Sequence, residues 1–165
     1  MFKLNDYLVY QKNIYQIIGI KYKYLNNQDY YILNSVIDPS LTIKLPCNNN
    51  SIRHIVNKDE VKEIIKKIPK IDIIKLDDKL LEIEYKKLLN GSLEDLIKII
   101  KTTYLKNKER LDSKKKISDK DKTYFDKAEL LLYTECGLAL NMTFEDTKNY
   151  IIKQIEIQNS KKEIK

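Results

Sequence analysis

The spacing of apolar residues along the chain changes once, near Asn57. Before this point, apolar residues recur mostly at every second position, which is the period of a β-strand with one buried face. After it they recur at every third or fourth position, which is the period of an amphipathic helix. The pattern predicts an α+β protein with a β domain at residues 1–57 and a helical domain at residues 58–165.

The first domain contains short segments rich in β-branched and aromatic residues, separated by polar turns. The clearest segment alternates strictly, with Leu41, Ile43 and Leu45 on one face and Thr42 and Lys44 on the other. We expect strands at residues 7–10, 14–18, 30–33, 41–45 and 52–56. Five strands in so short a span predict a small five-stranded β-barrel of the SH3 or Tudor type, because closure leaves few open edges.

The second domain predicts a compact helical bundle. Its first helix, at residues 58–67, begins with acidic residues and ends with basic ones before Pro69, which suits the helix dipole. A second helix is expected at residues 76–89, with an apolar stripe formed by Leu80, Leu81, Tyr85 and Leu88. Ser92, Ser118 and Thr143 each precede an acidic first turn and predict three further helix starts.

Composition adds a compartment and a class of partner. The 165 residues carry 31 Lys and Arg against 24 Asp and Glu, a net charge of +7 that fits an anionic partner. The chain shows no signal peptide and no apolar stretch long enough to span a membrane. Cys47 and Cys136 lack metal-ligand spacing, so we expect reduced thiols in a cytoplasmic protein.

Residues for catalysis are scarce. The single histidine, His54, lies in an expected strand and is interpreted as structural, and the sequence contains no common catalytic or nucleotide-binding motif. Glu135 lies on an apolar helix face, where it could be a general acid or a partly buried carboxylate bonded to a Lys or Tyr. We predict a protein that is not an enzyme, with no cofactor, metal or small-molecule substrate.

Basic residues are concentrated between Lys98 and Lys127, a segment that contains eleven basic and five acidic residues. Lys114, Lys115 and Lys116 stand together just before the helix start at Ser118. Side chains in such a connection can reach phosphates without reading bases. The alternative is a solvated loop whose lysines have no partner.

Several segments, in order along nearly the whole chain, carry a resemblance to a known family. They are FKLNDYLVY (2–10), YYIL (30–33), LTIKLP (41–46), SIRHI (51–55), EYKKLLNG (84–91), LIKIIK (96–101) and ECGLA (135–139). Together they resemble the CarD-like (CdnL) bacterial transcription regulators. The first module also resembles the polymerase-interacting domain of transcription-repair coupling factors.

The resemblance implies a function. In this family a Tudor-like domain docks on the β subunit of RNA polymerase, and the helical domain contacts promoter DNA at the upstream edge of the transcription bubble. These contacts modulate open-complex stability. The basic docking positions of the family correspond to Lys23 and Lys44 in this chain.

The chain departs from the family pattern in two places. The family's glycines after the first strand are absent, so we expect Asn13 to adopt a left-handed conformation at that turn. The family's tryptophan corresponds to Asp77, and Leu76 beside it could act as an apolar wedge in the minor groove. The residues predicted to contact DNA are Leu76, Asp77, Lys79, Lys86, Lys87, Lys101, Lys114, Lys115 and Lys116.

Two alternatives stay open on the sequence alone. The absent tryptophan is consistent with an adaptor that docks on polymerase without productive DNA engagement. An enzyme with an unrecognised site is the other alternative, and a deep polar pocket with perturbed carboxylates would favour it.

Overall fold

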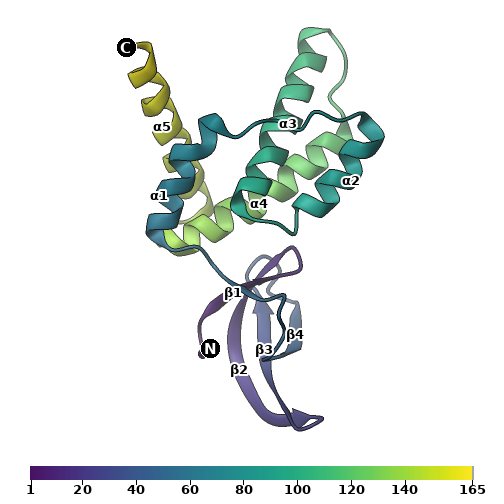
Figure 1. Cartoon of the computed structure of the whole chain (residues 1–165), viewed down its shortest axis with the longest axis vertical. Coiled ribbons are helices and arrows are strands. Elements are labelled where there is room, and N and C mark those ends of the chain that lie inside the picture. Colours follow the sequence, from purple (N-terminus) through teal and green to yellow (C-terminus); the bar gives the residue numbers. More distant parts are fainter. Residues whose placement is uncertain (165) are drawn as a thin grey trace. The chain divides into compact units, whose positions relative to one another are not determined.

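The computed structural model describes residues 1–164 and divides into two compact units, Met1–Ile55 and Val56–Lys165 (Figure 1). The first unit is a five-stranded antiparallel sheet and the second contains five α-helices, so the α+β prediction is confirmed. The strands are β1 (Tyr7–Tyr10), β2 (Asn13–Leu25), β3 (Gln28–Ser35), β4 (Thr42–Pro46) and β5 (Arg53–His54). The helices are α1 (Lys58–Lys67), the short 3₁₀ turn η1 (Ile68–Lys70), α2 (Asp78–Leu88), α3 (Leu93–Asp112), α4 (Asp119–Leu140) and α5 (Phe144–Glu163).

The strands follow the order β4-β3-β2-β1-β5. Within residues 1–164 the two edge strands, β4 and β5, do not pair with each other, so the sheet is open where the sequence predicted a closed barrel. β5 contains only two residues, which is too short to complete a ring of hydrogen bonds with β4.

Strand β2 extends well beyond the segment predicted from its apolar residues. It continues through Gly19 into a polar and aromatic stretch that ends at Leu25. Gly19 pairs with Ile32 of β3, and a Cβ at position 19 would lie 3.1 Å from Ile32 Cδ1. The glycine therefore leaves room for the Ile32 side chain on the outer face of the sheet.

The turn between β1 and β2 corrects the expectation for Asn13. Tyr10 pairs with Asn13, and the two residues between them, Gln11 and Lys12, have positive φ values of 43° and 58°. A two-residue hairpin needs two left-handed residues to match the strand twist. Asn13 itself belongs to β2, and its side-chain oxygen accepts hydrogen bonds from Ile14 N and Ser35 Oγ.

The inner face of the sheet forms the core of the first unit. Its buried residues are Leu8, Tyr15, Ile17, Tyr31, Leu33 and Leu45. Phe2 packs at the edge of this cluster, with its ring stacked on His54 at 4.0 Å and edge-on to Tyr31 at 6.1 Å. This contact fits the structural interpretation of His54.

Helix starts in the second unit follow the capping residues of the sequence. The side chains of Ser92, Ser118 and Thr143 each accept a hydrogen bond from a first-turn amide, which confirms the three predicted starts. Asn57 caps α1 in the same way, and the Glu60 side chain accepts a hydrogen bond from the backbone N–H of Asn57. At α2 the cap is Asp77, so this helix begins later than predicted.

The helices pack around a core to which all five contribute. Helix α3 lies against α4, α2 packs on α3, and α1 contacts both α4 and α5 (Figure 1). Glu135 of α4 is only 1% exposed, and its Oε1 accepts a hydrogen bond from the backbone N–H of Val56 at 3.0 Å. The sequence predicted a partly buried carboxylate with a hydrogen-bond partner, and the Val56 amide is one such partner.

The structure also bears on the thiols and on membrane-spanning segments. Both cysteines are free thiols, and burial raises the pKa of the Cys136 thiol to about 12. None of the helices within residues 1–164 has the length and apolar character needed to cross a membrane.

Candidate functional site

The outer face of the sheet gathers tyrosines and lysines, which we call the tyrosine–lysine face: Lys21, Tyr24, Tyr30 and Lys44. Lys44 Nζ donates a hydrogen bond to the Tyr24 hydroxyl at 2.9 Å. The Lys44 and Lys21 ammonium groups lie 4.7 Å and 4.6 Å from the Tyr24 ring centroid, within the range of cation–π contacts. The Tyr30 ring meets Tyr24 edge-on at 5.6 Å.

These contacts polarise an exposed phenol. The hydrogen bond from Lys44 and the charges of Lys44 and Lys21 lower the pKa of Tyr24 below its ordinary value of 10. Lys44 is exposed on β4, as the alternation of that strand predicted. This face therefore offers positive charge and aromatic surface together, next to an edge strand.

Lys23 lies beside this face in an unusual backbone conformation. Its φ is 49°, at an irregularity in the pairing of β2 with β3, and its amide donates to Asp29 Oδ1 at 2.9 Å. The conformation aims Lys23 and the neighbouring Tyr22 into solvent, where Tyr22 is 74% exposed. The two lysines predicted to contact polymerase thus lie in the same part of the first unit.

The predicted DNA wedge, Leu76, lies just before α2 and is 45% exposed. Asp77, the position of the family's tryptophan, caps the helix by accepting a hydrogen bond from Leu80 N at 3.0 Å. Leu80 and Ile83, one turn apart on α2, are 49% and 64% exposed. The sequence placed Leu80 in the core, but the core of α2 is formed by Leu81, Tyr85 and Leu88.

We call Leu76, Leu80 and Ile83 the α2 apolar ridge. Lys79 and Lys87, on the same helix, form no ion pair with any residue of the described chain, whereas Lys86 pairs with Glu82 at 3.2 Å. Lys101 is used differently, because its ammonium donates to the carbonyls of Ile68 and Ile71. Its ammonium group is therefore bonded within the helical unit, so Lys101 is less available to a phosphate than the other lysines predicted to contact DNA.

The three consecutive lysines form the turn that ends α3. Lys115 N–H bonds to the carbonyl of Arg110 at 2.8 Å, and Lys114 N–H bonds to that of Leu111 at 2.9 Å. This pair of bonds is a Schellman motif, in which glycine is the usual left-handed residue. Here Lys114 takes that position, with φ 58°, and all three lysines are exposed.

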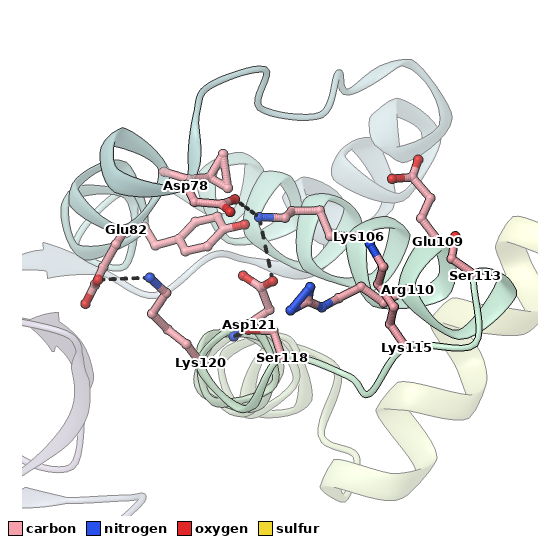
Figure 2. Close-up of a pocket in the computed structure, with 12 residues that line it drawn as sticks. Asp78, Glu82, Lys106, Glu109, Arg110, Ser113, Lys115, Ser118, Lys120 and Asp121 are labelled. Carbon is pink, nitrogen blue, oxygen red and sulfur yellow. Dashed lines mark hydrogen bonds and ion pairs between the residues drawn. The ribbon is translucent and has the colours of Figure 1, made fainter.

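A pocket of about 380 Å³ lies next to this turn, between α2, α3 and the beginning of α4 (Figure 2). Lys106 bridges two of its carboxylates, with Nζ 2.6 Å from Asp78 and 3.7 Å from Asp121. Lys120 pairs with Glu82 at 3.1 Å across the pocket. These bonds lower the pKa values of Asp78 and Glu82, so both carboxylates stay ionised.

Tyr85 also lines the pocket, although it is only 1% exposed. Its buried hydroxyl has no hydrogen-bond partner among the groups of the described chain. Burial, followed by the charges of Asp121 and Asp78, raises the pKa of the phenol well above its ordinary value. Within residues 1–164, no cluster of His, Cys, Asp and Glu has an arrangement suited to a metal ion.

Protein-family models and curated proteins were both compared with this chain, and neither comparison gives a match. The structure places the predicted DNA residues in three places: along α2 and just before it, within α3 at Lys101, and at the α3–α4 turn. The pocket was not predicted, because its lining residues are spread from Asp78 to Asp121 along the chain. Of the residues that line the pocket, Tyr85 was noted in the sequence only as part of the apolar stripe of the second helix.

Proposed function

We propose that this protein is a transcription regulator that docks on the β subunit of bacterial RNA polymerase and acts by contact, without catalysis. The observation that carries the proposal is the open β4 edge of the sheet, which presents Lys44 beside Tyr24. An open edge can receive a strand of a partner through main-chain hydrogen bonds, and the side chains beside it supply specificity. In this proposal the sheet is a Tudor-like module whose β4 edge binds polymerase. The protein would act in the cytoplasm, where RNA polymerase is found.

The proposal for the helical unit is a contact with promoter DNA at the upstream edge of the bubble. Its support is the exposed α2 apolar ridge next to Lys79 and Lys87. Minor-groove proteins insert apolar side chains between base steps, and neighbouring lysines hold the phosphates. Lys114 and Lys116 add two exposed charges at the α3–α4 turn. The resemblance to CarD-like regulators supports the same division of roles between the two units.

Co-purification with core polymerase tests the docking. The double variant Lys23→Glu/Lys44→Glu should lose most of its binding, because two charges that face the partner are reversed. Lys3→Glu is the matched control, since Lys3 is an exposed lysine of the same unit outside the tyrosine–lysine face. Unchanged binding of the folded double variant would overturn the assignment.

Promoter-complex lifetimes test the DNA contact and separate it from the adaptor alternative. Leu76→Ala should reduce the change in promoter-complex lifetime that the wild-type protein causes, and the wild-type effect should itself weaken at high salt. Leu130→Ala is the matched control, because Leu130 is 40% exposed on α4 and outside the ridge. If Leu76→Ala behaves like Leu130→Ala while polymerase binding persists, the protein is an adaptor.

A further inference from the structure

The pocket of the helical unit contains a hydrogen-bond donor that no protein group uses. Tyr85 is one of the residues that line the pocket, and its hydroxyl, which surrounding atoms shield, finds no acceptor within residues 1–164. Leaving a buried polar group unbonded destabilises a folded protein, so nearly all such groups have a partner. The hydroxyl keeps its proton because burial and the nearby carboxylates raise its pKa. It therefore remains an unused donor beside the pocket, which a ligand acceptor reaches when the side chains that shield the hydroxyl shift.

Most charges that line the pocket neutralise one another. Lys106 is shared by Asp78 and Asp121, and Glu82 is shared by Lys120 and Lys86. These ion pairs form two groups, one around Lys106 and one around Glu82, and Lys86 lies outside the pocket lining. Figure 2 shows the pairs between lining residues as dashed lines.

Two cations are left outside these groups. Neither Arg110 nor Lys115 forms an ion pair with a residue of the part of the chain that the structure describes. The carboxylate of Glu109, the remaining acidic residue of the lining, points away from the Arg110 side chain in Figure 2. Arg110 and Lys115 thus supply positive charge at one side of the pocket, together with the Ser113 hydroxyl.

From this arrangement we propose that the pocket binds a small phosphorylated molecule, whose phosphoryl group contacts Arg110 and Lys115 and whose other end accepts a hydrogen bond from Tyr85. An arginine fork matches two phosphate oxygens, and a lysine adds a point charge. The volume of about 380 Å³ lies in the range of sites for small molecules and exceeds what a phosphate group alone would fill. This site goes beyond the proposed regulator, whose DNA contacts use exposed ridges and turns.

Isothermal titration calorimetry of the full chain tests the proposal, with AMP, inorganic phosphate and adenosine as probes. AMP should bind and adenosine should not, because adenosine lacks the phosphoryl group. Arg110→Gln/Lys115→Gln should weaken AMP binding by about tenfold or more, since two charge-assisted contacts are lost. Lys58→Gln/Lys153→Gln, which neutralises two exposed lysines of α1 and α5, should leave the affinity within about twofold.

Tyr85→Phe tests the other end of the site. It should weaken AMP binding about three- to tenfold, because one hydrogen bond is removed, and leave any binding of inorganic phosphate unchanged. Binding of AMP or phosphate that is lost in Arg110→Gln/Lys115→Gln supports the site. The absence of binding for both probes at millimolar concentration, or equal binding by the variant and the wild type, overturns it.

A DNA arm distinguishes the two sources of a phosphate group. AMP binding that persists when a short duplex is added supports a small ligand with its own site. If Tyr85→Phe weakens binding of the duplex and AMP does not bind, the pocket takes a backbone phosphate and the proposal of a small ligand is overturned.

Discussion

Two tyrosines of this protein lie close to charged side chains, yet their surroundings shift their pKa values in opposite directions. Tyr24, on the outer face of the sheet, is 44% exposed and accepts a hydrogen bond from Lys44, which lowers its pKa. Tyr85, in the helical unit, is 1% exposed and unbonded, and burial raises its pKa.

The difference shows how exposure decides what a polar group can do. In water, an ammonium group can approach a phenol at little cost, so the tyrosine–lysine face stays open and suits a large partner. In the helical unit, Lys106 and Lys120 of the pocket bond to carboxylates, and the phenol is left with its proton and no acceptor. Such a site suits a ligand small enough to enter.

The largest effect is expected when each ring is removed. Tyr85→Ala should lower the free energy of unfolding by about 3–5 kcal/mol, because it empties a ring-sized volume in the helical core. Tyr24→Ala should cost at most about 0.5 kcal/mol, as expected for a substitution on an exposed face. Urea denaturation followed by far-UV circular dichroism measures both, and similar losses would remove the basis of the comparison.

A smaller effect of opposite sign is expected when only the hydroxyl of Tyr85 is removed. Tyr85→Phe should raise the free energy of unfolding by about 1 kcal/mol, because it deletes a buried donor that lacks a partner. Tyr24→Phe is the matched change on the sheet and should stay within about 0.5 kcal/mol. A loss of stability in Tyr85→Phe would mean that the hydroxyl has a partner in the folded protein.

Each region also holds a lysine with left-handed backbone, Lys23 on the sheet and Lys114 beside the pocket. Lys23→Gly and Lys114→Gly should each stabilise the protein by roughly 0.5–1 kcal/mol, because glycine adopts this conformation without the Cβ penalty. The corresponding alanine variants keep the penalty and should show no gain. Thermal unfolding of the four variants sharpens the comparison by showing whether both regions retain lysine at the expense of stability.

The smallest change concerns the ionisation of the two phenols. In an alkaline titration followed by tyrosinate absorbance, Tyr24 should ionise below its ordinary pKa of 10, and Lys44→Gln should remove this early step. Tyr24→Phe identifies the signal. If the early ionisation step is unchanged in Lys44→Gln, Lys44 is not the cause of the lowered pKa of Tyr24.

Tyr85 should affect the stability of the protein at high pH with the opposite sign. Its folded pKa is raised, so its contribution to stability is complete below the unfolded value of 10 and is lost as the pH rises above it. Stability should therefore decline less steeply above pH 10 in Tyr85→Phe than in the wild type, as measured by urea denaturation at several pH values.

Much of the helical unit could be predicted because helix starts are local. Ser92, Ser118 and Thr143 bond amides within one turn of themselves, and this requires no knowledge of distant residues. The prediction of the strands was less complete, because β2 continues through residues whose side chains are polar or exposed on both faces of the sheet. The order of pairing and the open edges depend on contacts between segments far apart, which periodicity does not encode.

The candidate site was predictable only where exposure follows from local position. The alternation of β4 placed Lys44 outward, and the connection before Ser118 exposed Lys114 and its neighbours. The sequence could not show that Lys101 would bond to the carbonyls of Ile68 and Ile71, because these partners lie about thirty positions away. The unbonded hydroxyl of Tyr85 depends in the same way on the packing of three helices.

The open β4 edge is also a place where two copies of this protein could pair. A row of unused main-chain groups can pair with the same edge of another copy, and such pairing leads to aggregation. The outward charge of Lys44 and the missing amide proton of Pro46, both on β4, oppose this pairing. The residues of this short strand therefore disfavour pairing between copies, although β4 is an edge strand of the sheet.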